Sequence, residues 1–290
     1  MDDRERAPEG SLFKFFSLTF ALTWASWLAF AAAGRFGTGV PALAILATPL
    51  LYLGVFAPAI VALTLTARAE GRPGVRALLR RLVQWRVGLR WYVFAVSYMA
   101  AIKLTGALVR RVATGEWPTF GHEAWYVMLA ATVVSTVVGG QAGEEIGWRG
   151  YALPRLEARL GLARASVLLG MIWACWHLPF FFIPGIDKTG QSFPMYLLQL
   201  TALSVAIAWL YRHTNGSLLL TMLMHSAINN TKDIVPAVVQ TAANPFALST
   251  SLAAWLTVAL LWIGAAYFLA RMPKVELSRT GEALASTSRR

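Results

Sequence analysis

Cysteine is nearly absent from this chain of 290 residues, which contains a single one, Cys175. One cysteine excludes a disulfide within the chain and any zinc cluster built from cysteine ligands. Cys175 lies two residues before His177, a spacing that on a helix turns the two side chains about 200° apart. The two residues therefore cannot act as nucleophile and base from one helix, and we interpret Cys175 as a small packing residue.

Charged residues are also scarce, at 14% of the chain, whereas hydrophobic residues make up 57%. A soluble globular domain has about 25% charged and about 45–50% apolar residues. The mean hydropathy of +0.55 and the long apolar runs are instead typical of a chain that crosses a bilayer. Acidic residues number only 14 against 26 basic ones. Because the basic residues stand between apolar segments, we attribute them to membrane orientation and expect no nucleic-acid partner.

The apolar segments predict an all-α bundle of about eight membrane-spanning helices. A helix needs about 20 mostly apolar residues to cross the hydrocarbon layer, and most of the segments reach this length. The seventh segment is short and contains a histidine and two asparagines, so its hydropathy is the weakest. The predicted spans are residues 14–33, 43–67, 91–110, 124–147, 165–183, 194–211, 216–231 and 251–271.

Lysine and arginine are distributed unevenly between the loops that these spans define. Twenty of them fall on the side of the N-terminus and five on the other side. Cytoplasmic loops carry the excess of basic residues, so we expect a multi-pass protein of the cell membrane with both ends in the cytoplasm. The five basic residues on the outer side are Arg35, Arg110, Arg111, Lys188 and Lys232.

We expect one transmembrane domain over residues 1–271, with its motif core at 124–231, followed by a polar tail at 272–290. Within the domain, residues 68–90 have apolar side chains at helical spacing among arginines. This pattern indicates a helix in the headgroup layer of the membrane lipids, and a solvated basic loop is the alternative.

Two adjacent carboxylates, Glu144 and Glu145, follow a run of small residues at the end of the fourth apolar segment. A charged group at the bilayer centre costs about 2.5–3.5 kcal/mol on insertion scales, so such residues point to function. Small residues allow neighbouring helices to approach closely. Glu145 and Arg149 are four residues apart and can pair, whereas Glu144 points about 100° away and remains available as a general base. A helix-end salt bridge without catalytic function is the alternative.

Histidines occur in two later apolar segments. His177 lies in the fifth, and His225 lies in the seventh, four residues before Asn229 and on the same helix face. An amide can donate to a developing oxyanion, and an imidazole can bind a metal or donate a hydrogen bond. The alternatives are a hydrogen-bonded core histidine and hydrogen bonds between helices, which would explain Asn230 equally well.

Together the three segments resemble the CPBP family of intramembrane peptidases, also called the CAAX-protease or Abi family, and within it the type II CAAX prenyl endopeptidases. The family has the motifs Glu-Glu-x-x-x-Arg, Phe-x-x-x-His and His-x-x-x-Asn on three helices. Residues 144–149 match the first motif and residues 225–229 the third. The second matches at His177 but has Trp173 in place of phenylalanine. Because tryptophan is also aromatic, we expect this exchange to affect packing more than chemistry.

The resemblance implies an intramembrane endopeptidase that hydrolyses a peptide bond of a membrane-anchored or lipidated substrate with an activated water. It implies that Glu144 is the general base and that His177 assists it. His225 and Asn229 would stabilise the oxyanion of the tetrahedral intermediate. Because Glu144 lies near the cytoplasmic end of its segment, we expect a water-filled cavity that opens to the cytoplasm.

The resemblance also implies supporting roles for Glu145 and Arg149, and it favours the presence of a metal. The family is usually described as metallopeptidases, and Glu144, His177 and His225 are an adequate ligand set for a divalent metal, above all Zn²⁺. The same groups can also activate water without a metal.

Two other classes of function remain as alternatives. One is a non-catalytic membrane scaffold or bacteriocin-immunity-type protein of the same fold, against which the complete set of three motifs argues. The other is a transporter that uses the ionisable residues as a relay. The chain shows no repeated pattern of broken helices, which argues against a transporter.

Overall fold

The computed structural model describes residues 11–36, 41–184, 186, 188, 191–236, 244–248 and 251–273. The regular structure of this described part is entirely helical, without strands, which confirms the all-α prediction. The predicted polar tail lies outside the described residues apart from its first two positions.

Ten α-helices and four short helices of other types make up the described part of the chain. The α-helices are α1 (Leu12–Phe36), α2 (Pro41–Arg80), α3 (Leu89–Thr114), α4 (Trp125–Val138), α5 (Gln141–Glu145), α6 (Leu153–Leu160), α7 (Leu162–Trp176), α8 (Phe193–His213), α9 (Leu218–Thr231) and α10 (Leu252–Arg271). The short ones are η2 (Arg81–Val83), the π-helix η3 (Ile146–Ala152), η4 (Leu178–Phe181) and η5 (Lys232–Ile234).

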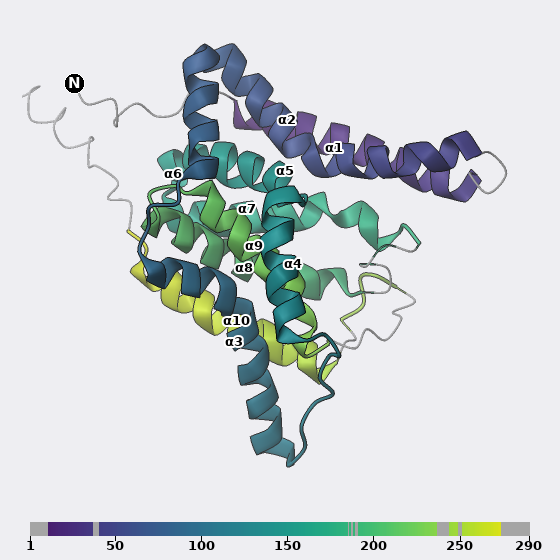
Figure 1. The fold of residues 1–290 in the computed structure, drawn as a ribbon, viewed down its shortest axis with the longest axis vertical. Coiled ribbons are helices and arrows are strands. Elements are labelled where there is room, and N and C mark those ends of the chain that lie inside the picture. Colours follow the sequence, from purple (N-terminus) through teal and green to yellow (C-terminus); the bar gives the residue numbers. More distant parts are fainter. Residues whose placement is uncertain are drawn as a thin grey trace, which may run out of the picture.

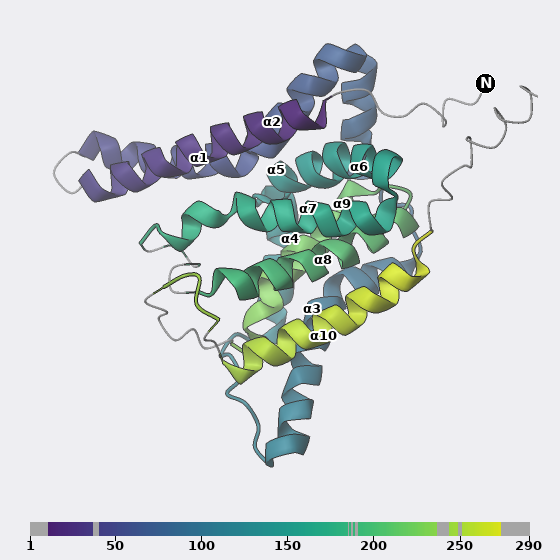
Figure 2. The ribbon, with the colours of Figure 1, turned by 180° about the vertical axis from the view of Figure 1, so that it is seen from behind.

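These helices are stacked in layers (Figure 1). The antiparallel pair of α1 and the first part of α2 lies at one end of the molecule, and α3 and α10 lie at the other (Figure 2). Between them, α7 packs against α6 on one side and against α8 on the other. Helix α9 contacts α3, α4, α5 and α8, so it lies at the centre of the bundle.

Eight membrane spans are not confirmed. Among the residues that the structure describes, five helices are long and apolar enough to cross a bilayer. A sixth span results if α4 and residues 141–160, which meet at a bend of 54°, are counted together. The predicted spans at 165–183 and 216–231 form α7 and α9, which have only 15 and 14 residues. Helix α7 stops just before Pro179, and α9 starts after a turn at Gly216 with a φ of 80°. Both are therefore shorter than their apolar segments suggested.

The arginine-rich segment is helical from residue 68 to residue 83, apart from a break at Gly71. Gly71 has a φ of 66° and a ψ of −161°, a conformation that favours glycine. Residues 84–88 are not helical, so the predicted helix covers only the first part of the segment. Its location in the headgroup layer stays a prediction.

This segment is attached to one end of the central helices. The guanidinium of Arg81 donates a hydrogen bond of 2.7 Å to the hydroxyl of Tyr211, near the C-terminal end of α8. The hydroxyl of Ser217 donates one of 2.7 Å to the carbonyl of Gln84, at the N-terminal end of α9. The arginines of the segment therefore lie at the same end of the bundle as these two residues.

The glycines that surround the paired glutamates pack against the backbone of α2. A Cβ atom added to Gly143 would lie 2.9 Å from the Cα atom of Phe56, and one added to Gly147 would lie 2.7 Å from the carbonyl carbon of Pro58. Only glycine permits this approach, so the predicted close packing through small residues is confirmed. The contact fixes α5 and η3, and thus both glutamates, against α2.

We expect the Gly147→Ala substitution to destabilise the protein because the added Cβ would overlap the backbone of α2 at Pro58. Overpacking of this kind costs about 1–3 kcal/mol. Thermal unfolding in detergent, followed by size-exclusion chromatography, should show a lower midpoint than for the wild type. Gly106→Ala is the matched control, since its added Cβ would meet the nearest atom at 3.7 Å. Equal midpoints for the two variants would contradict this close approach.

Candidate active site

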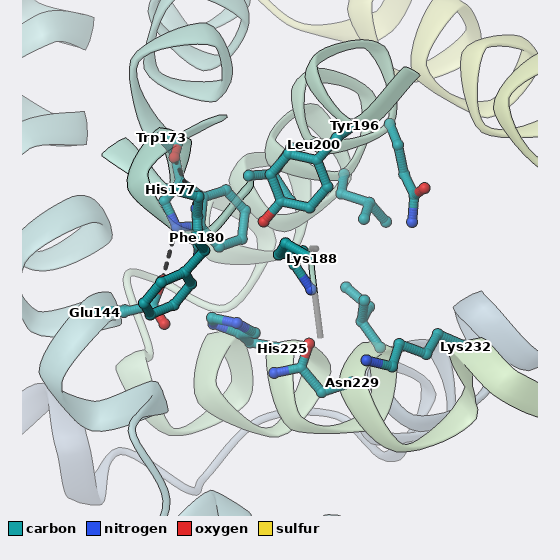
Figure 3. Close-up of a pocket in the computed structure, with 13 residues that line it drawn as sticks. Glu144, Trp173, His177, Phe180, Lys188, Tyr196, Leu200, His225, Asn229 and Lys232 are labelled. Atoms are coloured by element: carbon teal, nitrogen blue, oxygen red, sulfur yellow. Dashed lines mark hydrogen bonds between the residues drawn. The ribbon is translucent and has the colours of Figure 1, made fainter. Parts of the chain in front are cut away.

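One pocket of about 320 Å³ brings together all four residues that the sequence suggested for catalysis. Glu144 reaches it from α5, His177 from the end of α7, and both His225 and Asn229 from α9. Figure 3 shows these side chains around the same space, although they come from three separate segments.

Glu145 and Arg149 lie behind this pocket and are completely buried. Their side chains form an ion pair with an Nη1–Oε1 distance of 2.8 Å, which confirms the pairing predicted from their spacing. The same Oε1 atom accepts a hydrogen bond of 2.9 Å from Nδ1 of His225. The carboxylate of Glu145 thus joins α5 to α9, a contact that the sequence did not indicate.

This contact determines how His225 faces the pocket. A carboxylate can only accept hydrogen bonds, so Nδ1 of His225 carries the hydrogen. In a neutral imidazole, Nε2 is then an acceptor, which suits a metal ligand or a proton acceptor. His225 can donate a hydrogen bond from Nε2 only when both ring nitrogens are protonated.

Glu144 is held from a different helix. Its Oε2 atom accepts a hydrogen bond of 2.7 Å from the indole N–H of Trp173 on α7. Phenylalanine has no such donor, so tryptophan at this position adds a polar contact with Glu144 that the expectation of a packing effect did not include. In the sequence, only the hydrogen-bonding N–H group of the tryptophan side chain indicated that Trp173 could contact Glu144.

Trp173 contacts most of the other polar residues of the site as well. The Arg149 guanidinium lies over its ring at 4.3 Å, a cation–π arrangement. The ring of His225 packs edge-on against it, with centroids 5.2 Å apart. Its backbone carbonyl accepts a hydrogen bond of 2.9 Å from Nδ1 of His177. Trp173 therefore holds the site together, although sequence reasoning gave it no such role.

His177 lies at the end of a helix, whereas the sequence placed it within a continuous span. Helix α7 ends at Trp176, and His177 is its C-cap residue. Its ring packs edge-on against Trp176 and Tyr196, with centroids 4.6 and 5.5 Å apart. Since Nδ1 donates to a carbonyl, Nε2 of a neutral His177 is an acceptor.

The two neighbouring asparagines of α9 have different surroundings. Asn229 is exposed and faces the pocket. Asn230 donates a hydrogen bond of 3.1 Å to the hydroxyl of Ser135 on α4. Hydrogen bonding between helices therefore explains Asn230, whereas Asn229 lines the pocket.

The pocket contains the donor types that zinc prefers, two imidazoles and a carboxylate. In the part of the chain that the structure describes, however, no group of three or more His, Cys, Asp or Glu side chains is arranged to hold a metal ion. Glu144, His177 and His225 thus do not form a metal centre in this arrangement.

The pocket lies toward one end of the central helices. Its lining includes Lys188, just beyond α7, and Lys232, at the end of α9. Both belong to the basic residues that the charge count assigns to the outer side, whereas the opposite end of α8 contacts the arginine-rich segment through Tyr211. A cytoplasmic N-terminus places this end of the central helices on the outer side of the membrane. The predicted cavity that opens to the cytoplasm places the same end on the inner side, so the two predictions from the sequence conflict.

The sequence of this chain is similar to those of known proteins. Residues 122–231 match the family described as type II CAAX prenyl endopeptidase Rce1-like. Over 230 residues the chain is 24% identical to the CAAX prenyl protease 2 of Methanococcus maripaludis, an alignment that covers 76% of this chain and 83% of that protein. The match to the family includes all three motifs, from Glu144 to Asn229. The part of the chain that carries the three motifs is thus similar to the Rce1-like type II CAAX prenyl endopeptidases.

Proposed function

We propose that this protein is an intramembrane endopeptidase that hydrolyses a peptide bond of a membrane-anchored, lipidated peptide with a water activated by Glu144. The observation that supports this most is the shared pocket of Glu144, His177, His225 and Asn229. The relative from Methanococcus maripaludis is named a prenyl protease, which favours a prenylated substrate here too.

In the proposed reaction, the carboxylate of Glu144 accepts a proton from water as the oxygen attacks the scissile carbonyl. The indole of Trp173 holds one carboxylate oxygen and so fixes the direction of the other. Nε2 of neutral His177 accepts the second hydrogen of the water in a hydrogen bond and orients it. The protonated Glu144 then passes its proton to the amine as the C–N bond breaks.

The developing oxyanion needs donors on the opposite side of the scissile carbonyl. The amide of Asn229 supplies one from the face of α9 that lines the pocket. His225 supplies a second from Nε2 in its doubly protonated form, which the Glu145 carboxylate at Nδ1 holds in place. Glu145 and Arg149 are then positioning residues that contact no substrate.

A divalent metal remains the second candidate for activating the water, with Zn²⁺ the ion that two imidazoles and a carboxylate favour. Glu144, His177 and His225 would have to move together to bind it, because their present arrangement is not a metal centre.

We further propose, from the distribution of basic residues, that the N- and C-termini lie in the cytoplasm of the cell. The mouth of the pocket then faces away from the cytoplasm, because Lys188 and Lys232 belong to the outer segments. Helices α7 and α9 are short and central, and in this arrangement they cross only part of the bilayer.

Activity is the first test. Purified protein should cleave a farnesylated CAAX peptide, and Glu144→Gln should lower kcat by at least about 100-fold because the general base is lost. His177→Ala should also lower kcat. The matched control is Glu116→Gln, which makes the same change at an exposed residue outside the pocket. Peptide cleavage is followed by mass spectrometry.

Cleavage that survives both pocket substitutions would reject this site, and a wild type that cleaves no membrane peptide would favour the non-catalytic scaffold. A chelator and elemental analysis separate the two cofactor candidates in the same samples. Full activity of a metal-free preparation supports the metal-free reaction, whereas a loss that only added zinc restores would assign the pocket residues as metal ligands.

Stability should separate the two adjacent glutamates. Glu145→Ala leaves Arg149 buried without its partner, which typically costs about 3–5 kcal/mol. Glu144→Ala removes one hydrogen bond between a neutral donor and a carboxylate, worth about 1.5–3 kcal/mol, and leaves no partner charge unpaired. Thermal unfolding in detergent should therefore show a larger loss for Glu145→Ala, and a further Arg149→Met substitution should recover part of it. Similar losses for the two alanine variants would contradict the positioning role.

Orientation can be measured by cysteine labelling in a Cys175→Ala background. Asp233→Cys adds a thiol beside the pocket mouth, and Arg212→Cys adds one at the opposite end of the central helices, both at exposed positions. A membrane-impermeant maleimide should label the Asp233→Cys variant in intact spheroplasts and the Arg212→Cys variant only after permeabilisation. The reverse pattern would mean that the pocket opens to the cytoplasm.

A further inference from the structure

The part of α2 that follows the break at Gly71 carries arginines along one exposed face. Arg72, Arg76 and Arg80 recur every four residues, so their side chains form one stripe on the helix, and all three are exposed. The single acidic residue between positions 68 and 90 is Glu70, whose carboxylate forms an ion pair of 2.7 Å with an arginine of α6. The segment therefore presents its positive charge outward.

Apolar side chains border this arginine stripe. A groove of about 800 Å³ is lined by Val75, Leu79 and Val83 together with the three arginines. Leu79 and Val83 are large apolar residues with exposed side chains. Guanidinium groups beside exposed hydrocarbon suit a molecule that has an anionic head and an apolar body. A soluble anion would leave the apolar wall of the groove without a partner.

The opposite face of the same helix packs against the segment that carries the paired glutamates. Leu78 lies two residues before Arg80, so it points about 200° away from it, and its side chain is buried. A Cβ atom added to Gly150 would lie 2.7 Å from the Cδ1 atom of Leu78. Gly150 belongs to η3 and directly follows Arg149, the ion-pair partner of Glu145. The helix thus connects an outward arginine stripe with the buried ion pair behind the pocket.

The location of the groove is suited to a membrane surface. In Figures 1 and 2, the bend of α2 lies at the edge of the molecule. The contact of Arg81 with Tyr211 places the helix at the end of the bundle that faces the cytoplasm in the orientation proposed above. Anionic phospholipids are concentrated in the cytoplasmic leaflet. Just beyond the helix, Trp85 is exposed, and the Arg86 guanidinium lies 5.3 Å from its ring, as expected near lipid headgroups.

We propose that this groove binds an anionic phospholipid, with the phosphate at Arg72, Arg76 and Arg80 and the acyl chains against the apolar wall. Guanidinium groups pair with phosphate oxygens through two parallel N–H···O bonds, which makes arginine well suited to this contact. A bound lipid holds the helix in place over Gly150 and so stabilises the segment of the ion pair. The lipid site goes beyond the proposed peptidase function and does not depend on it.

The test measures lipid binding to the purified protein by native mass spectrometry, with phosphatidylglycerol and phosphatidylcholine as probes. The wild type should bind phosphatidylglycerol about 10-fold or more tightly, because each arginine near the surface attracts anionic lipid. The combined substitutions Arg72→Gln, Arg76→Gln and Arg80→Gln should remove this preference, whereas lysine at the same positions should keep most of it. The matched control removes the same charge at exposed positions outside the groove, with Arg111→Gln, Arg159→Gln and Arg164→Gln.

Thermal unfolding in detergent provides a second readout. Phosphatidylglycerol should raise the unfolding midpoint of the wild type above its value in phosphatidylcholine, because a ligand of the folded state stabilises that state. The two lipids should give the variant with glutamine in the stripe the same midpoint. An equal loss of lipid preference in the matched control would overturn the site, since scattered surface charge would then explain it. Inorganic phosphate that raises the midpoint as much as the lipid would also overturn it, in favour of a soluble anion. A protein that prefers phosphatidylglycerol but cleaves no peptide would count against the peptidase function alone.

Discussion

The geometry of the pocket depends on one buried carboxylate, that of Glu145. It pairs with Arg149 on its own segment and accepts a hydrogen bond from His225 on α9, so it fixes the relative position of two of the three motifs. A buried ion pair adds little net stability, because desolvation of both charges offsets their attraction. Its value here is positional, since the loss of any one partner leaves an unpaired charge or a misdirected imidazole in the interior.

Two further sets of contacts hold the segment of Glu144 and Glu145 in place, one with α7 and one with α2. Trp173 brings in α7, because its indole N–H holds Glu144 and its ring lies under the Arg149 guanidinium. Gly143 and Gly147 allow the segment that carries the two adjacent glutamates to pack closely against the backbone of α2. The adjacent glutamates thereby acquire different surroundings. The side chain of Glu145 is enclosed by its partners Arg149 and His225, whereas that of Glu144 borders the pocket and accepts a hydrogen bond from one neutral donor.

The sequence predicted those features that depend on local spacing. The ion pair of Glu145 and Arg149 follows from helical geometry, and the all-helical fold follows from composition. The contacts of Glu145 with His225 and of Glu144 with Trp173 join residues 80 and 29 positions apart, so they depend on packing that no local pattern encodes. The count of eight spans is not confirmed, because hydropathy measures how apolar a segment is and not where a proline or a glycine turn ends its helix.

Helix α9 shows why the polar residues of this chain are concentrated where hydropathy is weakest. One side of it forms the hydrogen bonds that attach it to α4, through Ser226 with the carbonyl of Thr132 and through Asn230 with Ser135. The other side presents His225, Asn229 and, just past its end, Lys232 to the pocket. Polar groups are tolerated at membrane depth only where protein or water surrounds them. A helix at the centre of the bundle meets this condition on both sides. Of the three residues that made the seventh segment a poor span, His225 and Asn229 line the site, and Asn230 attaches the helix to α4.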